Sequence, residues 1–436
     1  MAESILQETG RSWYEHLPRS VLGLVRKGLL DVLECITWGC IEVHDAHGVR
    51  TLGSRSNPGP RVSVQVHDED FWGYMGLGGS VGAGQSYFLG LWDTDDLVDL
   101  VRILVRNRFT LDHMDRGSFG RIGMKAYRWF HARRENTLAG SRANISAHYD
   151  LGNDFYELML DPTMMYSAAI YPDEDADLET AQRHKLDVIC DKLLLSPDVH
   201  LLEIGTGWGG LALHAAARHG CRVTTTTISH EQYRHARERV RAAGLEHLVE
   251  VIECDYRLLE GTYDRIVSIE MIEAVGHQYF DTYFRRLEEL LAPDGLALIQ
   301  AITIEDRKFP QYRDGVDFIR RFVFPGGCLP SATVLLDTMQ RTTRLRVRHL
   351  EDIGDHYART LAEWQRNVDT HSERLLEMGY DRTFQRLWRY YLAFCQGGFM
   401  ERSIGDVQVL FEHVDSRHPA PVLGVGRDFL PAQKLA

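Results

Sequence analysis

The hydrophobic pattern changes near residue 178, where short apolar runs begin to alternate with amphipathic helical segments. The runs predicted as strands are VHLLEIG, CRVTTTTIS, VEVIECD, YDRIVSIEMI and GLALIQAIT, with helices between them, one of which covers residues 279–291. Alternation of strands and helices at this spacing is typical of βαβ units. We therefore predict an α/β fold with a doubly wound, Rossmann-like parallel sheet.

The first part of the chain mixes helical and strand patterns. Residues 20–36 and 95–107 carry apolar side chains at helical spacing, and residues 41–52 have the pattern of a hairpin. Over residues 61–67 valines alternate with polar residues, which predicts a half-buried strand. We predict a small α+β domain over residues 1–125 that carries no catalytic motif of its own.

One stretch of 22 residues, Phe71 to Trp92, has no formally charged side chain and is long enough to span a bilayer. Seven of these residues are glycine, and each glycine costs about 1 kcal/mol relative to alanine inside a helix. We therefore predict tight turns between short buried segments, and not a membrane span.

Composition and charge narrow the class of protein. Of 436 residues, 44% are hydrophobic and 25% are charged, as in ordinary globular proteins. The formal net charge of −13 argues against a nucleic-acid-binding protein, which presents a basic surface. The seven cysteines lack CxxC spacing and the 20 histidines lack HExxH, so neither a disulfide framework nor a metal site is indicated. Since the first residues, MAESILQETG, lack the basic region of a signal peptide, we expect a cytoplasmic protein.

Two basic stretches stand out in this acidic chain. One is a predicted linker over residues 126–143, where arginines are interleaved with aromatic residues, and the other places Arg344, Arg346 and Arg348 on one face of a predicted strand. A solvated surface is the simpler interpretation of both stretches. The alternative is contact with anionic lipid headgroups, because basic side chains near interfacial aromatics suit a lipid surface.

A glycine-rich loop follows the first predicted strand of the sheet, where that strand turns into a helix. The loop reads Glu203-Ile204-Gly205-Thr206-Gly207-Trp208-Gly209-Gly210. The pattern is neither GxGxxG nor a P-loop, and Glu203 would repel a phosphate. S-adenosylmethionine fits better, since it carries an ammonium group, a sulfonium and a ribose. Gln232 and the pair Asp255-Tyr256, after the next two strands, are candidates to contact its ribose and adenine.

Seven motifs follow one another along the second part of the chain: AHYDLGNDFYELMLDPTMMYS (147–167), LLEIGTGWGGLA, TISHEQ, CDYR, DRIVSIEMIEAVG, FPGGCLPS and HYARTLAEW. Together they resemble the cyclopropane-fatty-acyl-phospholipid synthases, a group that includes mycolic acid cyclopropane synthases and related fatty-acid C-methyltransferases. The resemblance is dense over about residues 140–413 and thin before them. It implies a class I methyltransferase domain over residues 144–436 with lipid-binding insertions after residue 303.

The resemblance also implies which residues contact S-adenosylmethionine. They are Tyr166, Ser167, Glu203, Gly205, Gly207, Gly209, Thr227, Ser229, Gln232, Asp255 and Tyr256. In the family a bicarbonate ion lies beside the reacting double bond and acts as the base. The sequence keeps three of the positions that hold this ion, namely Glu273, Ile302 through its backbone, and Tyr357.

Other positions of the bicarbonate site depart from the family. Ala168 stands where the family has a cysteine, and Gln300 where it has a histidine. We expect a weakened bicarbonate site in which the Gln300 amide still donates, since each lost bond to a charged group costs about 1–3 kcal/mol. Cys395 matches a second cysteine singled out in the family, but it lies on the apolar stripe of a predicted helix. That position favours packing over covalent catalysis.

The chemistry of the reaction sets further requirements. An isolated double bond is a poor nucleophile, so the methyl sulfonium must be held in line at close range with water excluded. Methyl transfer leaves a carbocation on the acyl chain, which aromatic faces stabilise. Candidate aromatics are Tyr166, Tyr171, Tyr283, Phe322, Phe324, Tyr357 and Tyr391. Loss of a proton from the transferred methyl closes a cyclopropane, whereas loss or hydride shift elsewhere gives a methylene- or methyl-branched chain.

We therefore expect an enzyme that converts the cis double bond of unsaturated phospholipid acyl chains into a cyclopropane, associated peripherally with the inner face of the membrane. The altered base site makes a methylene- or methyl-branched product the main alternative. A methyltransferase for a soluble small molecule would not explain the long segment after residue 303. A noncatalytic lipid-binding protein would not need intact cofactor motifs. The sequence leaves open whether two copies form a homodimer.

Overall fold

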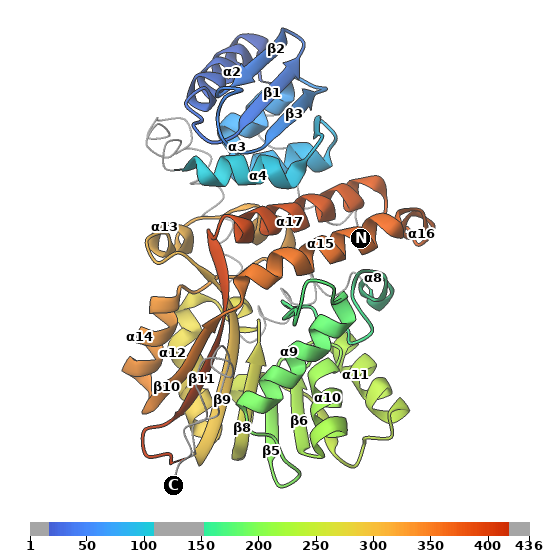
Figure 1. Cartoon of the computed structure of the whole chain (residues 1–436), viewed down its shortest axis with the longest axis vertical. Coiled ribbons are helices and arrows are strands. Elements are labelled where there is room, and N and C mark those ends of the chain that lie inside the picture. Colours follow the sequence, from blue (N-terminus) through green and yellow to red (C-terminus); the bar gives the residue numbers. More distant parts are fainter. Residues whose placement is uncertain (1–16, 109–151, 418–436) are drawn as a thin grey trace.

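The computed structural model describes residues 17–108 and 152–417 of the chain. In its N-terminal part a small sheet packs with three helices (Figure 1). In chain order the elements are α2 (Arg19–Leu33), β1 (Cys40–Asp45), β2 (Gly48–Leu52), β3 (Arg61–Val66), α3 (Asp70–Phe88), β4 (Trp92–Thr94) and α4 (Leu97–Arg106). The sheet order is β2-β1-β3-β4, and β1 and β2 form an antiparallel hairpin. The predicted hairpin, strand and flanking helices of this part are confirmed.

The glycine-rich stretch was predicted wrongly as a set of tight turns. It forms the helix α3, which is broken at Gly79, where φ is 54° and ψ is −136°. Close packing explains two of the glycines, because a Cβ at Gly84 would collide with the ring of Phe318 and a Cβ at Gly76 with Val25. The approach of other elements therefore outweighs the low helix propensity of glycine. Within the described ranges, we find no helix long and apolar enough to cross a membrane.

The second sheet has seven strands. They are β5 (His200–Ile204), β6 (Arg222–Thr227), β7 (Val249–Glu253), β8 (Tyr263–Ile269), β9 (Leu291–Ile304), β10 (Leu345–Asp352) and β11 (Ile404–His413), in the order β10-β11-β9-β8-β5-β6-β7. The five strands from β9 to β7 pair in parallel, and β11 is antiparallel to both β9 and β10. The predicted doubly wound sheet is confirmed, whereas β11 was not predicted.

Helices cover both faces of this sheet (Figure 1). They are α9 (Leu178–Lys192), α10 (Gly210–His219) and α11 (His230–Ala242) on one face, and α12 (Phe280–Leu290) and α14 (Ala332–Thr342) on the other. Short helices lie outside these layers: α8 (Asn153–Met159), α13 (Phe309–Arg313) and α16 (Ser372–Glu377), with a π-helix over Ile319–Val323. The two apolar layers bury the sheet on both sides, which explains its long apolar strands.

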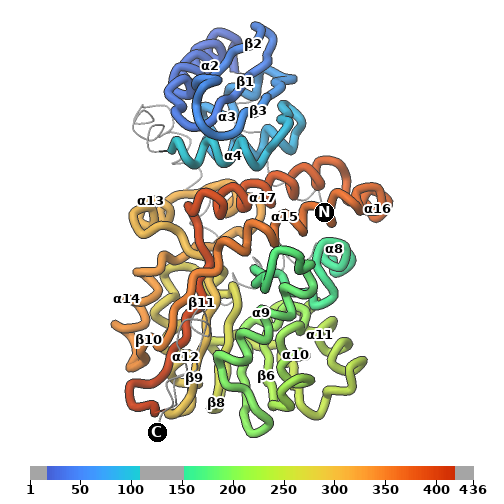
Figure 2. Tube along the Cα trace, viewed as in Figure 1, coloured from blue at the N-terminus to red at the C-terminus, as the bar shows by residue number. Residues whose placement is uncertain are grey.

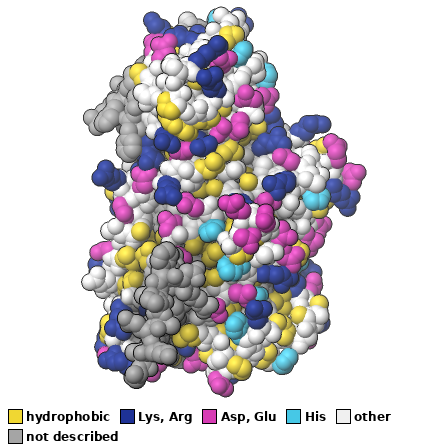
Figure 3. Space-filling view, viewed as in Figure 1, with side chains coloured by type: hydrophobic (Ala, Val, Ile, Leu, Met, Phe, Trp, Pro, Cys, Tyr) yellow, Lys and Arg dark blue, Asp and Glu magenta, His cyan; other side chains and the backbone are white. Residues whose placement is uncertain are grey.

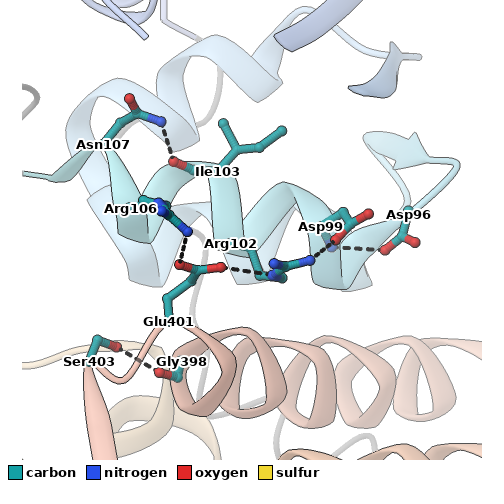
Figure 4. A network of polar contacts seen from close by, with 9 residues as sticks. All are labelled: Asp96, Asp99, Arg102, Ile103, Arg106, Asn107, Gly398, Glu401 and Ser403. Atoms are coloured by element: carbon teal, nitrogen blue, oxygen red, sulfur yellow. Dashed lines mark hydrogen bonds and ion pairs between the residues drawn. The ribbon is translucent and has the colours of Figure 1, made fainter. Parts of the chain in front are cut away.

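Two long helices, α15 (Gly354–Thr370) and α17 (Arg382–Met400), lie between the large sheet and the N-terminal part (Figure 2). Arg386 of α17 donates to the carbonyl oxygens of Tyr87 (2.7 Å) and Trp92 (2.9 Å) and to Asp93 Oδ1 (2.7 Å). At the other end of the same contact, Glu401 pairs with Arg102 at 2.8 Å and Arg106 at 3.4 Å (Figure 4). Because these bonds join charged groups, they fix the N-terminal part on α17.

The arginines of the second basic stretch are paired with acidic side chains, which agrees with the simpler interpretation of a solvated surface. Arg346 and Arg348 both pair with Glu412 of β11, and Arg344 pairs with Asp415 at 3.0 Å. Figure 3 shows basic and acidic side chains interspersed over the visible face of the described residues. The predicted linker 126–143 and both predicted domain boundaries lie outside the described residues.

Candidate functional site

A cavity of about 440 Å³ lies at the carboxyl ends of the parallel strands, the edge at which doubly wound sheets bind ligands. Residues that follow β5, β6, β7 and β8 form its floor. Its walls come from α15 and α17, and Val105 of α4 brings the N-terminal part to the same space. The cavity therefore connects the glycine loop with an apolar region beneath the two long helices.

The glycine loop has the backbone that its sequence requires. Gly205, Gly207 and Gly209 all have positive φ, at 103°, 52° and 85°. A Cβ at Gly207 would meet no atom within 4 Å, and this residue lines the cavity. Gly209 instead precedes α10 as its N-terminal cap and does not line the cavity. A ligand can therefore approach the loop backbone closely at Gly207.

Two buried charged side chains lie beside the loop. Glu203 is 3% exposed, and its Oε2 accepts a hydrogen bond of 2.5 Å from Thr225 Oγ1. Burial raises the pKa of this carboxyl to about 8. Lys185 is fully buried and donates to Ser167 Oγ at 2.7 Å, while burial lowers the pKa of its ammonium to about 8. Of the two, Glu203 lines the cavity, whereas Lys185 lies behind Ser167 and holds the hydroxyl of that residue.

Most residues predicted to contact the cofactor line this cavity. They are Tyr166, Ser167, Glu203, Gly205, Gly207, Thr227, Gln232, Asp255 and Tyr256. Ser229 does not line it, because its side chain caps α11 by accepting from the backbone N–H of Gln232 at 3.3 Å. The Asp255 carboxylate accepts two hydrogen bonds from Arg257, at 2.8 and 2.6 Å, so a ligand would share it with that arginine.

Aromatic rings gather at the far end of the cavity. Of the candidates for cation stabilisation, the structure brings together Tyr166, Phe324, Tyr357 and Tyr391, and it does not bring Tyr171, Tyr283 or Phe322 into the lining. The hydroxyls of Tyr166 and Tyr391 are 2.9 Å apart. Cys395 lines the same end, and burial raises the pKa of its thiol, which keeps it protonated. This state agrees with packing and not with a thiolate nucleophile.

The sequence-based site lacks one residue that the structure places at its centre, Glu270. Tyr357 Oη donates to Glu270 Oε2 at 2.7 Å. The backbone N–H of Ala168 and the Gln300 amide both donate to Glu270 Oε1, each at 2.8 Å. Glu270 directly follows β8 and lines the cavity. Glu273 was predicted because a carboxylate that follows a parallel strand lies at the ligand-binding edge of the sheet. The same argument applies to Glu270 and could have identified it from the sequence.

The expectation that Gln300 donates to bicarbonate is wrong for this arrangement. The Gln300 amide nitrogen donates to Glu270 and also to Asp406 Oδ2 at 2.9 Å, which uses both of its hydrogens. Its oxygen accepts from Gln408 at 3.0 Å. Gln300 is fully buried and does not line the cavity. The amide is therefore part of a buried network and is closed to an exogenous anion.

Glu273 and Ile302 lie together, as predicted from the resemblance. The backbone N–H of Ile302 donates to Glu273 Oε1 at 2.5 Å. Glu273 Oε2 is buried without a hydrogen-bond partner among the described residues, and the residue lines the cavity. Burial and the neighbouring Glu270 raise the pKa of the Glu273 carboxyl to about 8. The side chain is therefore protonated at neutral pH.

This raised pKa predicts a pH-dependent gain in stability for Glu273→Gln. Between its unfolded pKa near 4.5 and its folded pKa near 8, the folded state binds more protons, so wild-type stability falls as pH rises. Glutamine does not titrate and so removes this loss. The free energy of unfolding of the variant, relative to that of the wild type, should therefore increase by on the order of 3 kcal/mol from pH 5 to pH 8.5. Urea unfolding at both pH values measures it, with the exposed Glu260→Gln as reference. A difference that does not change with pH would contradict the raised pKa.

Comparisons with known proteins agree with this geometry. The family model described as mycolic acid cyclopropane synthetase matches residues 136–409. The chain is 37% identical over 340 residues to a tuberculostearic acid methyltransferase of Mycobacterium tuberculosis, covering 74% of this chain and 77% of that protein. It is 35% identical over 371 residues to the cyclopropane-fatty-acyl-phospholipid synthase of Escherichia coli, covering 82% of this chain and 90% of that protein.

A solved structure supports the same relationship. The crystal structure of a mycolic acid cyclopropane synthase in complex with SAH and CTAB superposes with a TM-score of 0.58 and 30% identity. The match covers 62% of this chain and 97% of that one. The part of the chain that carries the seven-stranded sheet and the cavity is thus the part that these proteins share.

Proposed function

The chain belongs to the mycolic acid cyclopropane synthetase family, and from this premise we propose that it methylates the cis double bond of unsaturated phospholipid chains to give a methylene branch. It is an S-adenosylmethionine-dependent methyltransferase that acts on lipid acyl chains. The observation that carries the proposal is that one continuous cavity joins the glycine loop to an apolar, aromatic-lined region. A methyl donor and an acyl chain can therefore meet inside the protein.

The residues at the loop fit S-adenosylmethionine. Gly207 leaves open space beside its backbone, and Glu203 and Gln232 place polar side chains near it. When bound, this cofactor supplies an electrophilic methyl group. Most residues of the loop are buried, and electrostatic interactions are stronger in a site from which water is excluded.

The aromatic end suits a cationic acyl chain. Tyr166, Phe324 and Tyr391 line the cavity, and the faces of aromatic rings attract a positive charge. Cys395 stays a neutral thiol, so it does not trap the cation as a thiolate would. The chain thus supplies stabilisation without a strong nucleophile near the reacting carbon.

Two observations support a methylene branch as the product. The base site departs from the family at Ala168 and Gln300, and the relative at 37% identity carries the name of a methyltransferase. A saturated methyl branch needs in addition a hydride from a reductant. The methylene chain is the branched product that methyl transfer, hydride shift and proton loss give without one.

Cyclopropane formation is the second candidate, favoured by the match over 90% of the Escherichia coli synthase. Both products arise from one cation, and both add CH₂ to the chain.

For phospholipid substrates we propose that the protein works at the membrane surface, where the acyl chain enters the cavity between α17 and α4. Val105 of α4 lies in the cavity wall on this side.

Transfer of a labelled methyl group to lipid vesicles tests the proposed activity. We expect label to enter vesicles of cis-monounsaturated phosphatidylglycerol and not vesicles with saturated chains of equal length, which serve as the matched control. Equal labelling of both, or label confined to soluble acceptors, would contradict methylation of an acyl-chain double bond.

A further inference from the structure

We propose that the carboxylate of Glu270 is the base that removes the proton from the transferred methyl group, in the position that bicarbonate takes in the family. This inference rests on the proposed function and names a further catalytic residue for it. Three independent features of the structure support it: the donors around the carboxylate, the charges next to it, and its backbone conformation.

The donors around Glu270 form an anion site that is already filled. Tyr357 comes from α15, Gln300 from β9, and Ala168 from the segment before α9, and all three donate to the two oxygens of Glu270. The family resemblance assigns these same three positions to the bicarbonate site. A carboxylate and bicarbonate share a planar pair of anionic oxygens. The side chain of Glu270 therefore occupies the place of the exogenous ion, and the residue lines the cavity.

The neighbouring groups favour the proton on Asp406 over Glu270. Glu270 and Asp406 interact directly, and burial beside Glu270 raises the pKa of Asp406 well above its usual value. Burial also raises the pKa of Glu270, but its three hydrogen-bond donors and the buried Lys185 act in the opposite direction. Asp406 has one bond to its Oδ2, from Gln300. Of this pair Glu270 is thus the carboxyl that is left free to accept a proton, since Asp406 holds the shared one more tightly.

The backbone of Glu270 is in a conformation that favours glycine. Its φ is 47°, and its N–H donates to the Gln300 carbonyl at 2.8 Å, which fixes that conformation at the end of β8. A non-glycine residue persists in this region when the surroundings impose it, and such residues cluster at functional sites. The conformation directs the carboxylate to the donors and the cavity.

The proposed step balances without an added oxidant or reductant. The π electrons of the alkene form the new C–C bond as the C–S bond breaks, and the sulfur keeps that electron pair. A hydride shift moves the positive charge onto the methyl-bearing carbon. Glu270 then takes a proton from the methyl group, and the C–H electrons form the C=C bond of the methylene branch. Direct proton loss without the shift would close the ring and would use the same base.

Two substitutions at one position test this base. Glu270→Gln fills the space but cannot accept the proton, and its turnover should fall at least about 100-fold. Glu270→Gly relaxes the backbone and empties the anion site, and formate or bicarbonate should restore its turnover in a saturable way. The wild type should work equally well in bicarbonate-depleted buffer, and Glu270→Gln should not respond to either anion. Circular dichroism and the affinity for S-adenosylmethionine report that each variant is folded.

Turnover of Glu270→Gln within threefold of the wild type, or a folded Glu270→Gly that neither anion restores, would overturn the proposal. Calorimetry with formate gives a readout that does not depend on turnover: Glu270→Gly should bind it and the wild type should not. A wild type that methylates no lipid would refute the proposed function, and the formate titration would still decide whether Glu270 fills the anion site. Equal formate binding by both proteins would show that it does not.

Discussion

The variant Gly207→Val is expected to lose at least about 100-fold in affinity for S-adenosylmethionine, a loss of about 2.7 kcal/mol, while it remains folded. Gly207 lines the cavity, and the space beyond its Cα is open over 4 Å. A branched side chain would enter the volume that the cofactor needs. Isothermal titration calorimetry of the variant and wild type measures the loss.

Gly244→Val is the matched control for this substitution. Gly244 has a positive φ of 68° and open space at its Cβ, as Gly207 does, but it does not line the cavity. Both variants therefore carry backbone strain from a β-branched residue in the left-handed region. Only Gly207→Val should lose the cofactor. An unchanged affinity in that variant would refute the assignment of the loop.

Tyr357→Phe is expected to lower turnover about 10- to 100-fold, because one hydrogen bond to a charged group contributes about 1.5–3 kcal/mol. The phenol donates to Glu270 at 2.7 Å, while the ring stacks on Phe399 with centroids 4.5 Å apart. Phenylalanine keeps the stacking and removes the donor. The affinity for S-adenosylmethionine should not change, which separates this effect from that of Gly207→Val.

Tyr390→Phe removes a phenol of similar burial without touching the cavity. Tyr390 of α17 is 5% exposed and packs on Phe318, and it is absent from the cavity lining. Its turnover should stay within twofold of the wild type. If Tyr357→Phe behaves in the same way, the phenol of Tyr357 has no part in the reaction.

The doubly wound sheet could be predicted because its strands and helices follow simple apolar periods, whereas two elements could not. In β11 the polar residues Asp406 and Gln408 are fully buried, where they bond to Gln300, so the usual alternation of buried apolar and exposed polar positions is absent. In α3 two glycines allow close approach of distant side chains, Val25 at Gly76 and the rings of Phe318 and Tyr390 at Gly84. Both depend on contacts that no local pattern contains.

In the site, too, some residues could be predicted from the local sequence and others depend on distant contacts. Glu273 was found because a carboxylate after a parallel strand lies at the ligand-binding edge, but the three donors that single out Glu270 lie between 30 and 102 positions away in the sequence. From the sequence, Gln300 was predicted to donate to bicarbonate, because a glutamine side chain carries N–H donors. The structure shows its hydrogens bound to Glu270 and Asp406.

Product analysis by NMR tests the central claim most directly, because methylene and cyclopropane chains have the same mass. The protein is incubated with ¹³C-methyl S-adenosylmethionine and vesicles of cis-monounsaturated phospholipid, and the extracted lipid is examined. The account predicts that the label appears in an olefinic =CH₂ group on the acyl chain. A label found in the CH₂ of a cyclopropane ring would contradict the branched product, and a lipid without label would contradict the methylation of acyl chains.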